Sequence, residues 1–135
     1  MPRGVLMPTA RATYATCCLS LTLADYTRMG VFVLGGGKGA DGASTVPDGW
    51  FAEAGSPAAK FGGGFGYGYQ WWNQKVGDYM VLFAWGHGGQ YIMMIPELDA
   101  VVVFTSSVTS ESRRPTYKRP IFELLENDIL PFLEK

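Results

Sequence analysis

The sequence is poor in the residues that build metal, redox and nucleic-acid sites. It has one histidine and two cysteines. The cysteines, Cys17 and Cys18, are adjacent, a spacing at which a disulfide between them is strained, so small buried hydrophobic residues are expected there. A zinc site needs three or four ligands, so we expect neither a metal nor another cofactor. The net charge is −1, which excludes a strong electrostatic attraction to nucleic acid. The densest basic run is interpreted as a solvated connection: Arg113, Arg114, Lys118 and Arg119.

Long hydrophobic runs are also missing. No apolar stretch approaches the roughly 20 residues of a membrane span, so none is predicted. The N-terminal residues resemble a signal peptide only loosely, because Pro8 and Arg11 interrupt the apolar stretch. We expect residues 1–16 to be poorly ordered and residues 17–135 to belong to one domain. The sequence does not indicate a localisation.

The hydrophobic and turn-forming residues predict an α+β fold, an antiparallel β-sheet meander with flanking helices and a C-terminal helix. Thr22 as N-cap and Asp25 three residues later predict a helix over residues 23–34, which Gly30 weakens and the following glycines end. A short helix is expected over residues 46–54, with Pro47 at its first position. The other expected elements are a loop at 55–64, strands at 67–72, 79–85, 90–95 and 100–105, a polar turn at 73–78, and a helix from about Pro120 that Pro131 kinks or ends.

One of these strands is apolar on both faces. Residues 100–104 read Ala-Val-Val-Val-Phe. A strand buried on both faces lacks the alternation of polar and apolar side chains, so this one is predicted to be central and covered by helices.

The candidate site is a glycine-rich loop between two strands, Trp85-Gly86-His87-Gly88-Gly89-Gln90. Glycine has no Cβ, so the backbone approaches a ligand closely there. Backbone N–H groups in such a loop suit an oxyanion hole. We predict the His87 backbone N–H as its donor, with Gly86, Gly88, Gly89, Gln90 and Trp85 as substrate-binding residues. The simpler interpretations are a tight turn, an exposed loop histidine and a buried tryptophan.

Several motifs in order carry a family resemblance. They are residues 19–30 (Leu-Ser-Leu-Thr-Leu-Ala-Asp-Tyr-Thr-Arg-Met-Gly), Gly36-Gly37, Val46-Pro47-x-x-Trp50, residues 67–72 (Tyr-Gly-Tyr-Gln-Trp-Trp), Ala84-x-Gly86-x-x-Gly89-Gln90 and Ile95-Pro96-x-x-Asp99. Together they resemble the C-terminal part of β-lactamase-related serine hydrolases, in the branch of esterases and 6-aminohexanoate-dimer hydrolases. The resemblance covers roughly residues 17–134 and implies a partial β-lactamase or transpeptidase-like fold.

The resemblance implies hydrolysis of a small ester or amide through an acyl-enzyme. In that family a serine of Ser-x-x-Lys attacks, the lysine and a tyrosine of Tyr-x-Asn move the proton, and a third motif on a strand completes the oxyanion hole. This sequence has no Ser-x-x-Lys and no Tyr-x-Asn. Its third motif, at Gly86–Gly89, lacks the lysine of Lys-Thr-Gly, which fits the esterase-like branch. We therefore expect the chain to be inactive alone.

Two other hypotheses remain. The chain is a non-catalytic module that binds a ligand or associates through an exposed sheet edge near residues 101–104, with a second copy or with an N-terminal half. Otherwise it is a truncated fragment with no function of its own. Ser106, Ser107 and Ser110 are candidate hydroxyls without evident partners and are interpreted as loop residues.

Overall fold

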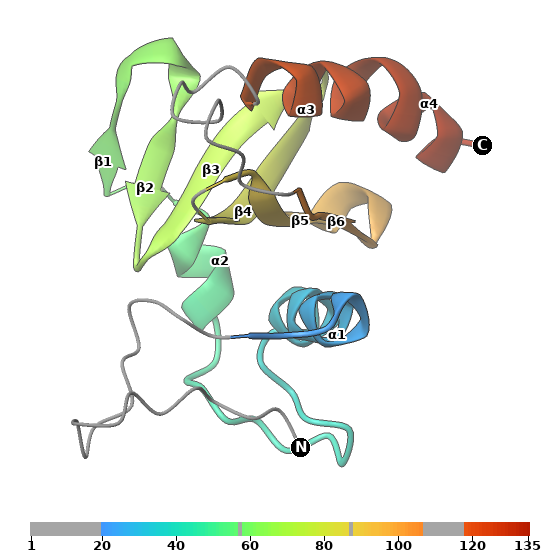
Figure 1. The fold of residues 1–135 in the computed structure, drawn as a ribbon. Coiled ribbons are helices and arrows are strands. Elements are labelled where there is room, and N and C mark those ends of the chain that lie inside the picture. Colours follow the sequence, from blue (N-terminus) through green and yellow to red (C-terminus); the bar gives the residue numbers. More distant parts are fainter. Residues whose placement is uncertain (1–19, 57, 87, 107–117) are drawn as a thin grey trace, which may run out of the picture.

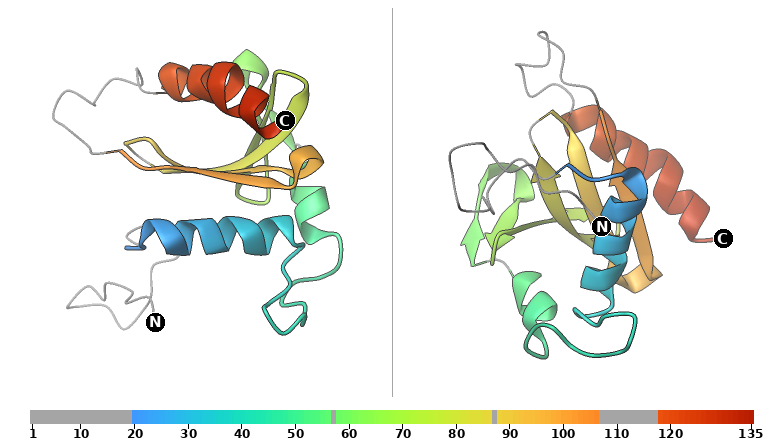
Figure 2. Two further views of the ribbon diagram at one scale, coloured as in Figure 1. Left: turned by 90° about the vertical axis from the view of Figure 1, so that its right-hand side faces the viewer. Right: turned by 60° about the horizontal axis from the view of Figure 1, so that its bottom comes forward.

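The computed structural model describes residues 20–56, 58–86, 88–106 and 118–135. Within them, six strands form one antiparallel sheet in the order β1-β2-β3-β4-β5-β6, so strands that follow one another in the chain also pair in the sheet. One helix covers one face of this sheet, and the C-terminal helical segment covers the other (Figures 1 and 2). The predicted α+β class and the antiparallel meander are confirmed.

The element bounds are as follows. The strands are β1 (Ala59–Lys60), β2 (Gly66–Gly68), β3 (Trp71–Val76), β4 (Tyr79–Gly86), β5 (Gln90–Ile95) and β6 (Ala100–Phe104). The helices are α1 (Leu23–Leu34), α2 (Trp50–Ala54), α3 (Lys118–Leu124) and α4 (Leu130–Leu133), with a π-helical segment (Leu125–Ile129) between the last two. Two 3-10 turns occupy Gly62–Gly64 and Pro96–Leu98.

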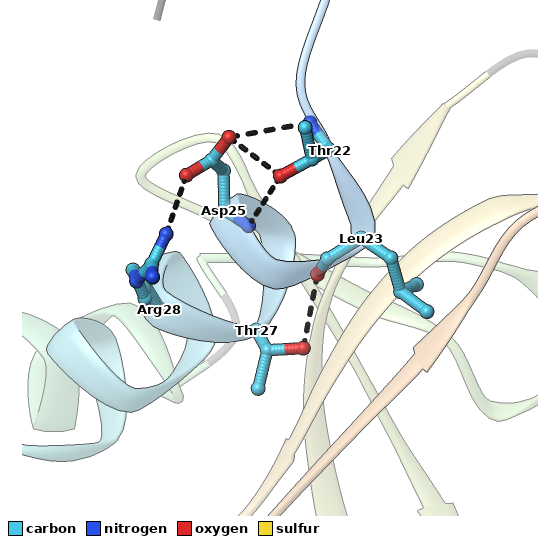
Figure 3. A network of polar contacts seen from close by, with 5 residues as sticks. All are labelled: Thr22, Leu23, Asp25, Thr27 and Arg28. Carbon is cyan, nitrogen blue, oxygen red and sulfur yellow. Dashed lines mark hydrogen bonds and ion pairs between the residues drawn. The ribbon is translucent and has the colours of Figure 1, made fainter. Parts of the chain in front are cut away.

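The first helix begins at the predicted capping box. The Asp25 amide donates to Thr22 Oγ1 at 3.2 Å, and the Thr22 amide and hydroxyl donate to Asp25 Oδ2 at 3.3 and 2.7 Å (Figure 3). Arg28 holds the other carboxylate oxygen at 2.9 Å. These bonds satisfy amides that have no partner inside the helix, which fixes where α1 starts.

Gly30 sets how closely α1 lies on the sheet. A Cβ placed on Gly30 would lie 2.4 Å from Val101 Cγ1 and 3.0 Å from Ile92 Cγ2. The residue is buried, and α1 contacts β5 and β6 through this part of its surface. The glycine that weakens the helix locally therefore permits its close packing on the sheet.

The sheet separates two hydrophobic clusters. On the α1 face, Leu82, Ile92 and Met94 pack with Val33. On the opposite face, residues one step along the same strands, such as Phe83 and Met93, are fully buried with Leu125 of the π-helical segment. Each large side chain of this kind contributes about 1.5–3 kcal/mol by its burial. Adjacent residues of β4 and β5 thus serve two cores, which fixes the register of this hairpin.

The expected strand over residues 67–72 is wrong, because this stretch is a hairpin. Tyr69 and Gln70 have φ of 50° and 70°, and they turn the chain so that Tyr67 pairs with Trp72. Such a turn is usually made by Asn-Gly, so the sequence gives no signal for it. Residues distant in the chain hold Tyr69: its hydroxyl donates to Glu53 Oε1 at 2.6 Å, and its ring lies 4.9 Å from that of Trp50.

Three neighbouring expectations are also wrong. Most of the predicted polar turn at residues 73–78 belongs to β3, and only Gly77 and Asp78 lie between β3 and β4. These polar residues belong to β3 because their backbone pairs with the apolar strand β4. The predicted loop at residues 55–64 contains β1 and a 3-10 turn. The short helix begins at Trp50, not near Pro47, because Gly49 has a left-handed φ of 78°.

The last strand is correctly predicted as covered on both faces but wrongly as central. Val101 and Val103 pack with the α1 cluster, and Val102 and Phe104 pack with the C-terminal helical segment. Nevertheless, among the described strands β6 is the last of the sheet. An edge strand between two helical layers is apolar on both faces like a central one, so composition does not distinguish the two positions.

The C-terminal helical segment is described from Lys118 onward. It does not end at Pro131, but its regular α-helical part is interrupted just before this proline. The π-helical segment precedes this proline, which then stands in the first turn of α4. Proline has no N–H, and the start of a helical turn tolerates that loss. No helix in the described part of the chain is both long and apolar enough to cross a membrane.

Some expectations fall outside the described residues. They concern the N-terminal segment 1–16, Cys17, Cys18, His87, Ser107, Ser110, Arg113 and Arg114.

Candidate functional site: the β4–β5 hairpin

The predicted site residues lie at the end of the β4–β5 hairpin. Gly86, the last residue of β4, pairs with Gln90, the first residue of β5. The Gly89 amide donates to the Gly86 carbonyl at 3.3 Å, which closes a tight turn. Gly88 and Gly89 both have φ of 87°, a region that residues with a Cβ rarely adopt. Glycine is therefore required at both positions by the turn itself.

Gln90 and Ser106 connect this turn to the end of β6. The Gln90 side-chain amide donates to the Ser106 carbonyl at 3.2 Å. The Ser106 hydroxyl donates to the Gly88 carbonyl. Ser106, for which the sequence suggested no partner, therefore holds the glycine turn, and the Gln90 amide serves the same connection. Both contacts fix the position of the turn relative to the sheet.

Gly86 leaves room for Gln90. A Cβ on Gly86 would lie 3.1 Å from Gln90 Oε1 and 3.3 Å from Gln90 Cβ. Such distances are shorter than ordinary van der Waals contact, so a larger residue would displace the glutamine. Gly86 is thus explained by the hairpin's own packing, whether or not a ligand also approaches it.

Trp85 belongs to an aromatic cluster on the C-terminal helix face. Its ring stacks on Tyr91 at 5.9 Å with an interplanar angle of 10°, and it contacts Trp72 at 5.6 Å. The side chain is only partly buried. Its packing role, the simpler of the two interpretations, is thereby explained, and its partly exposed ring stays available at the end of the strand.

Lys118 lies beside this cluster, although sequence reasoning grouped it with a solvated connection. Its Nζ is 3.3 Å from the centre of the Phe65 ring and 4.7 Å from that of Trp85. Burial among these rings lowers the pKa of the Lys118 ammonium. The nearby Arg119 behaves as expected, since it is exposed and pairs with Glu123 at 2.7 Å. The sequence contains no signal for Lys118, because residues 65 and 85 are distant along the chain.

Two of the hairpin glycines are less exposed than backbone that lines an open cleft. Gly88 and Gly89 are buried, whereas Gly86 and Gln90 are partly exposed. Three cavities lined by described residues lie elsewhere, under α2 and beside α3. The predicted oxyanion donor, the His87 amide, lies outside the described residues. Among the residues that are described, no cluster of His, Cys, Asp and Glu side chains is placed to hold a metal ion.

Comparison of the sequence with models of known protein families gives no match, and neither does comparison with characterised proteins.

Proposed function

We propose that this chain is the C-terminal part of a serine hydrolase with a β-lactamase-like fold, acting on small esters or amides. The ordered motifs in the sequence support this function. The observation that carries the proposal is the tight glycine turn at the end of β4 and β5, with Gly88 and Gly89 at φ of 87°. Ser106, which follows β6, holds this turn through two hydrogen bonds. Glycine backbone without side chains therefore lies at the end of the sheet.

Such a turn has one part in acyl transfer. When a nucleophile attacks an ester or amide carbonyl, negative charge develops on the carbonyl oxygen, and fixed backbone N–H donors stabilise it. The Gly89 amide is used within the turn, in its bond to the Gly86 carbonyl, so the donor that we propose is the His87 amide, which lies outside the described residues. The bonds of Gly89, Gln90 and Ser106 fix the described part of the turn. A fixed donor needs no rearrangement when the charge appears, so its contribution to the rate is largest in a rigid element like this one.

The remaining chemistry requires groups that the sequence does not contain. An acyl-enzyme needs an activated nucleophile with a base within hydrogen-bond reach. Without Ser-x-x-Lys and Tyr-x-Asn, the 135-residue chain holds the stabilising part of the machinery and lacks the reacting part. We propose that a separate polypeptide or a longer form of the chain supplies the serine, and that this chain alone is inactive.

The test uses a fluorophosphonate probe, which labels activated serines. The isolated chain is expected to remain unlabelled, and stoichiometric labelling of one serine would contradict the proposal. The genomic sequence upstream is then read for an in-frame Ser-x-x-Lys and Tyr-x-Asn, and the longer product is labelled in the same way. There, Gly89→Ala should slow labelling, while Gly62→Ala, far from the hairpin with nothing within 4 Å of an added Cβ, should not.

A specific observation supports the alternative of a self-associating module. The edge strand β6 has five uncharged residues and no proline, so its outer backbone groups can pair with another strand. Beside it, α1 exposes Leu23 and Val31, with 56% and 57% of their surfaces accessible. An apolar edge without charge is self-complementary, so a second copy related by a twofold axis is the partner it fits.

The position of these side chains follows from helix geometry. Successive residues of an α-helix are rotated by about 100°, which puts Leu23 and Val31 on one flank of α1 and Phe32 and Met29 on the other. The ring of Phe32 contacts Phe51 of α2 at 6.2 Å, so that flank faces α2. The flank with Leu23 and Val31 therefore faces away from α2, toward the outer side of β6.

Sedimentation equilibrium tests this alternative with a matched pair of variants. Val31→Lys should convert a dimer into a monomer, because it places a charge beside the edge. Met29→Lys changes a similarly exposed residue, 42% accessible, on the opposite flank and should leave the dimer intact. A wild-type protein that remains monomeric at all accessible concentrations refutes the alternative.

A further inference from the structure

Two adjoining cavities lie between α2 and the sheet. One has a volume of about 240 Å³ and the other about 250 Å³. Both are lined by Phe51, Ala52, Leu82 and Pro96, so they share a wall, and we name them together the α2 chamber. Pockets for drug-sized ligands measure about 300–1,000 Å³, so each cavity alone is smaller than this range and the two together fall in its lower part.

Aromatic packing holds one wall of the chamber in place. The Phe51 ring stands edge-to-face with Phe32 of α1 at 6.2 Å and with Trp71 of β3 at 5.9 Å. These contacts join α2 to the first helix and to the sheet. The walls of the cavity are therefore held by contacts within the protein, as is usual for small-molecule sites.

Asn73 gives the chamber its buried polar group, whereas the other polar side chain of the lining, Ser56, belongs to an exposed residue. The Asn73 side chain is only 3% exposed and lines the second cavity. Its Nδ2 is buried and has no hydrogen-bond partner among the residues that the structure describes. A buried donor without an acceptor destabilises a fold, so such a group calls for a specific explanation. A ligand acceptor in the cavity would satisfy it.

The rest of the lining restricts what that ligand is. Its larger side chains are apolar, among them Val33, Leu82 and Met94. No charged side chain belongs to the described residues that line either cavity. An anion buried there would lack a countercharge, which is strongly unfavourable. A hydrocarbon would fit the walls but leave the Asn73 donor unsatisfied.

We propose that the α2 chamber binds a small neutral molecule with an apolar chain and one carbonyl oxygen, such as a ketone, ester or amide, and that this oxygen accepts a hydrogen bond from Asn73 Nδ2. The apolar chain lies along Phe51 and Leu82 toward Met94. The residues of the chamber come from α1, α2 and three neighbouring strands, so binding stabilises the packing of α2 on the sheet.

This site is separate from the β4–β5 hairpin. The chamber contacts β4 at Met80, Val81 and Leu82. Gly86 is four residues further along the strand, about 13 Å away at 3.3 Å per residue. The proposal therefore does not depend on the hydrolase function, and either can fail without the other.

The experiment measures binding of 2-octanone to the whole chain by NMR. The sequence contains only two asparagines, Asn73 and Asn127, so the side-chain amide signal of Asn73 is assigned by its loss in Asn73→Leu. We expect 2-octanone to shift this signal saturably. We expect octanoate, which has the same chain length and a negative charge, to bind at least about tenfold more weakly because of the desolvation penalty.

Two variants distinguish a specific site from a nonspecific one. Asn73→Leu should weaken 2-octanone binding about tenfold, the loss expected for one buried hydrogen bond, as followed in both proteins by the backbone amide signal of Leu82 at the chamber. Gln74→Leu is the matched control: Gln74 is the next residue of β3, lines a different cavity beside α3, and should leave the affinity unchanged. Because Ala52 is exposed at the chamber, Ala52→Phe should block binding without disturbing the core, which provides a test independent of Asn73.

Several outcomes overturn the proposal. The absence of a saturable shift shows that the chamber takes no such ligand. Equal affinities for the wild type and Asn73→Leu show that Asn73 donates to water and not to the ketone. Equal weakening by Gln74→Leu shows that the effect is not local to the chamber.

Discussion

Replacing Gly30 with alanine has two opposing effects on the free energy of unfolding. In a helix interior, alanine is favoured over glycine by about 1 kcal/mol. Here, however, the new Cβ would lie 2.4 Å from Val101 Cγ1, well inside contact distance. Overpacking of this kind costs about 1–3 kcal/mol, because either Val101 must leave its rotamer or α1 must move off the sheet. The net expectation is a destabilisation of about 1 kcal/mol, or roughly 4 °C in Tm.

The assay is urea unfolding followed by circular dichroism, with Gly55→Ala as the control. Gly55 follows α2 with φ of −70° and ψ of −18°, and its added Cβ would be 3.4 Å from the nearest atom, the Ala52 carbonyl oxygen. Alanine fits there, so the free energy of unfolding should rise by about 0.4–1 kcal/mol. The two substitutions are chemically identical and are expected to have opposite signs.

A double-mutant cycle tests the cause. Val101→Ala removes two methyl groups from a partly buried site and should cost about 1.5 kcal/mol alone. In that background Gly30→Ala no longer meets Val101 Cγ1 and should be neutral or stabilising, which gives a favourable coupling of about 1 kcal/mol or more. If Gly30→Ala stabilises the wild type as much as Gly55→Ala does, or if no coupling is found, the close approach of α1 to β6 is wrong.

Three other substitutions test local features. Thr22→Ala should cost about 1 kcal/mol at neutral pH through loss of the helix cap. The Thr22 hydrogen bonds lower the pKa of Asp25 below its ordinary 3.8, so the part of the stability that depends on the Asp25 carboxylate is present above pH 3.8 and is lost as the pH falls through the folded-state pKa; the difference between the urea midpoints of the two proteins should narrow in acid. Gln70→Gly should raise the urea midpoint by the equivalent of about 1 kcal/mol, because it relieves the left-handed φ of 70°. The stability of Lys118→Met relative to the wild type should be highest at neutral pH. Burial lowers the pKa of Lys118 below 10.5, so unfolding takes up a proton as the pH approaches 10.5, and the stability difference should shift in favour of the wild type; a difference that is constant with pH would contradict this.

The sequence predicts best those elements whose determinants are local. Residues 23–34 are predicted as a helix with both ends correct, because Thr22, Asp25 and the terminal glycines act within one turn. The β5 strand is also predicted with its observed bounds, since turn residues lie on either side of it. Here the local signals and the tertiary structure agree.

Elements that depend on distant contacts are predicted poorly. The Tyr69-Gln70 turn lacks the usual Asn-Gly signal, and Tyr69 is held by Glu53, which lies 16 residues earlier. The position of β6 at the edge depends on which strands are present beside it, and its own residues do not encode that. For such elements, apolar content indicates burial but not place in the sheet.

The candidate sites show the same division. The glycines of the β4–β5 turn are recognisable from sequence, because residues 86–89 are contiguous and their backbone requirement is local. Asn73 lay within a predicted polar turn, although it is buried in a strand. The signal for a strand would be alternating polar and apolar side chains from Trp71 to Val76. Polar residues occur on both faces of this stretch, so the alternation is not visible in the sequence. Lys118 could be recognised only from the fold, which brings Phe65 and Trp85 beside it.

The π-helical segment has a consequence for the length of the chain. Leu125 and Leu130 are five residues apart, and both are buried on the same side of the sheet, whereas an α-helix brings residues three or four apart onto one face. The segment therefore behaves as a helix with one supernumerary residue. Deleting Asn127 would bring Leu125 and Leu130 to α-helical spacing, but it would also place Pro131 inside a continuous helix, where its missing N–H and its ring cost about 3 kcal/mol. The deletion should therefore be tolerated only together with Pro131→Ala, whereas elsewhere in this helix a single-residue deletion would rotate every following side chain away from its partner.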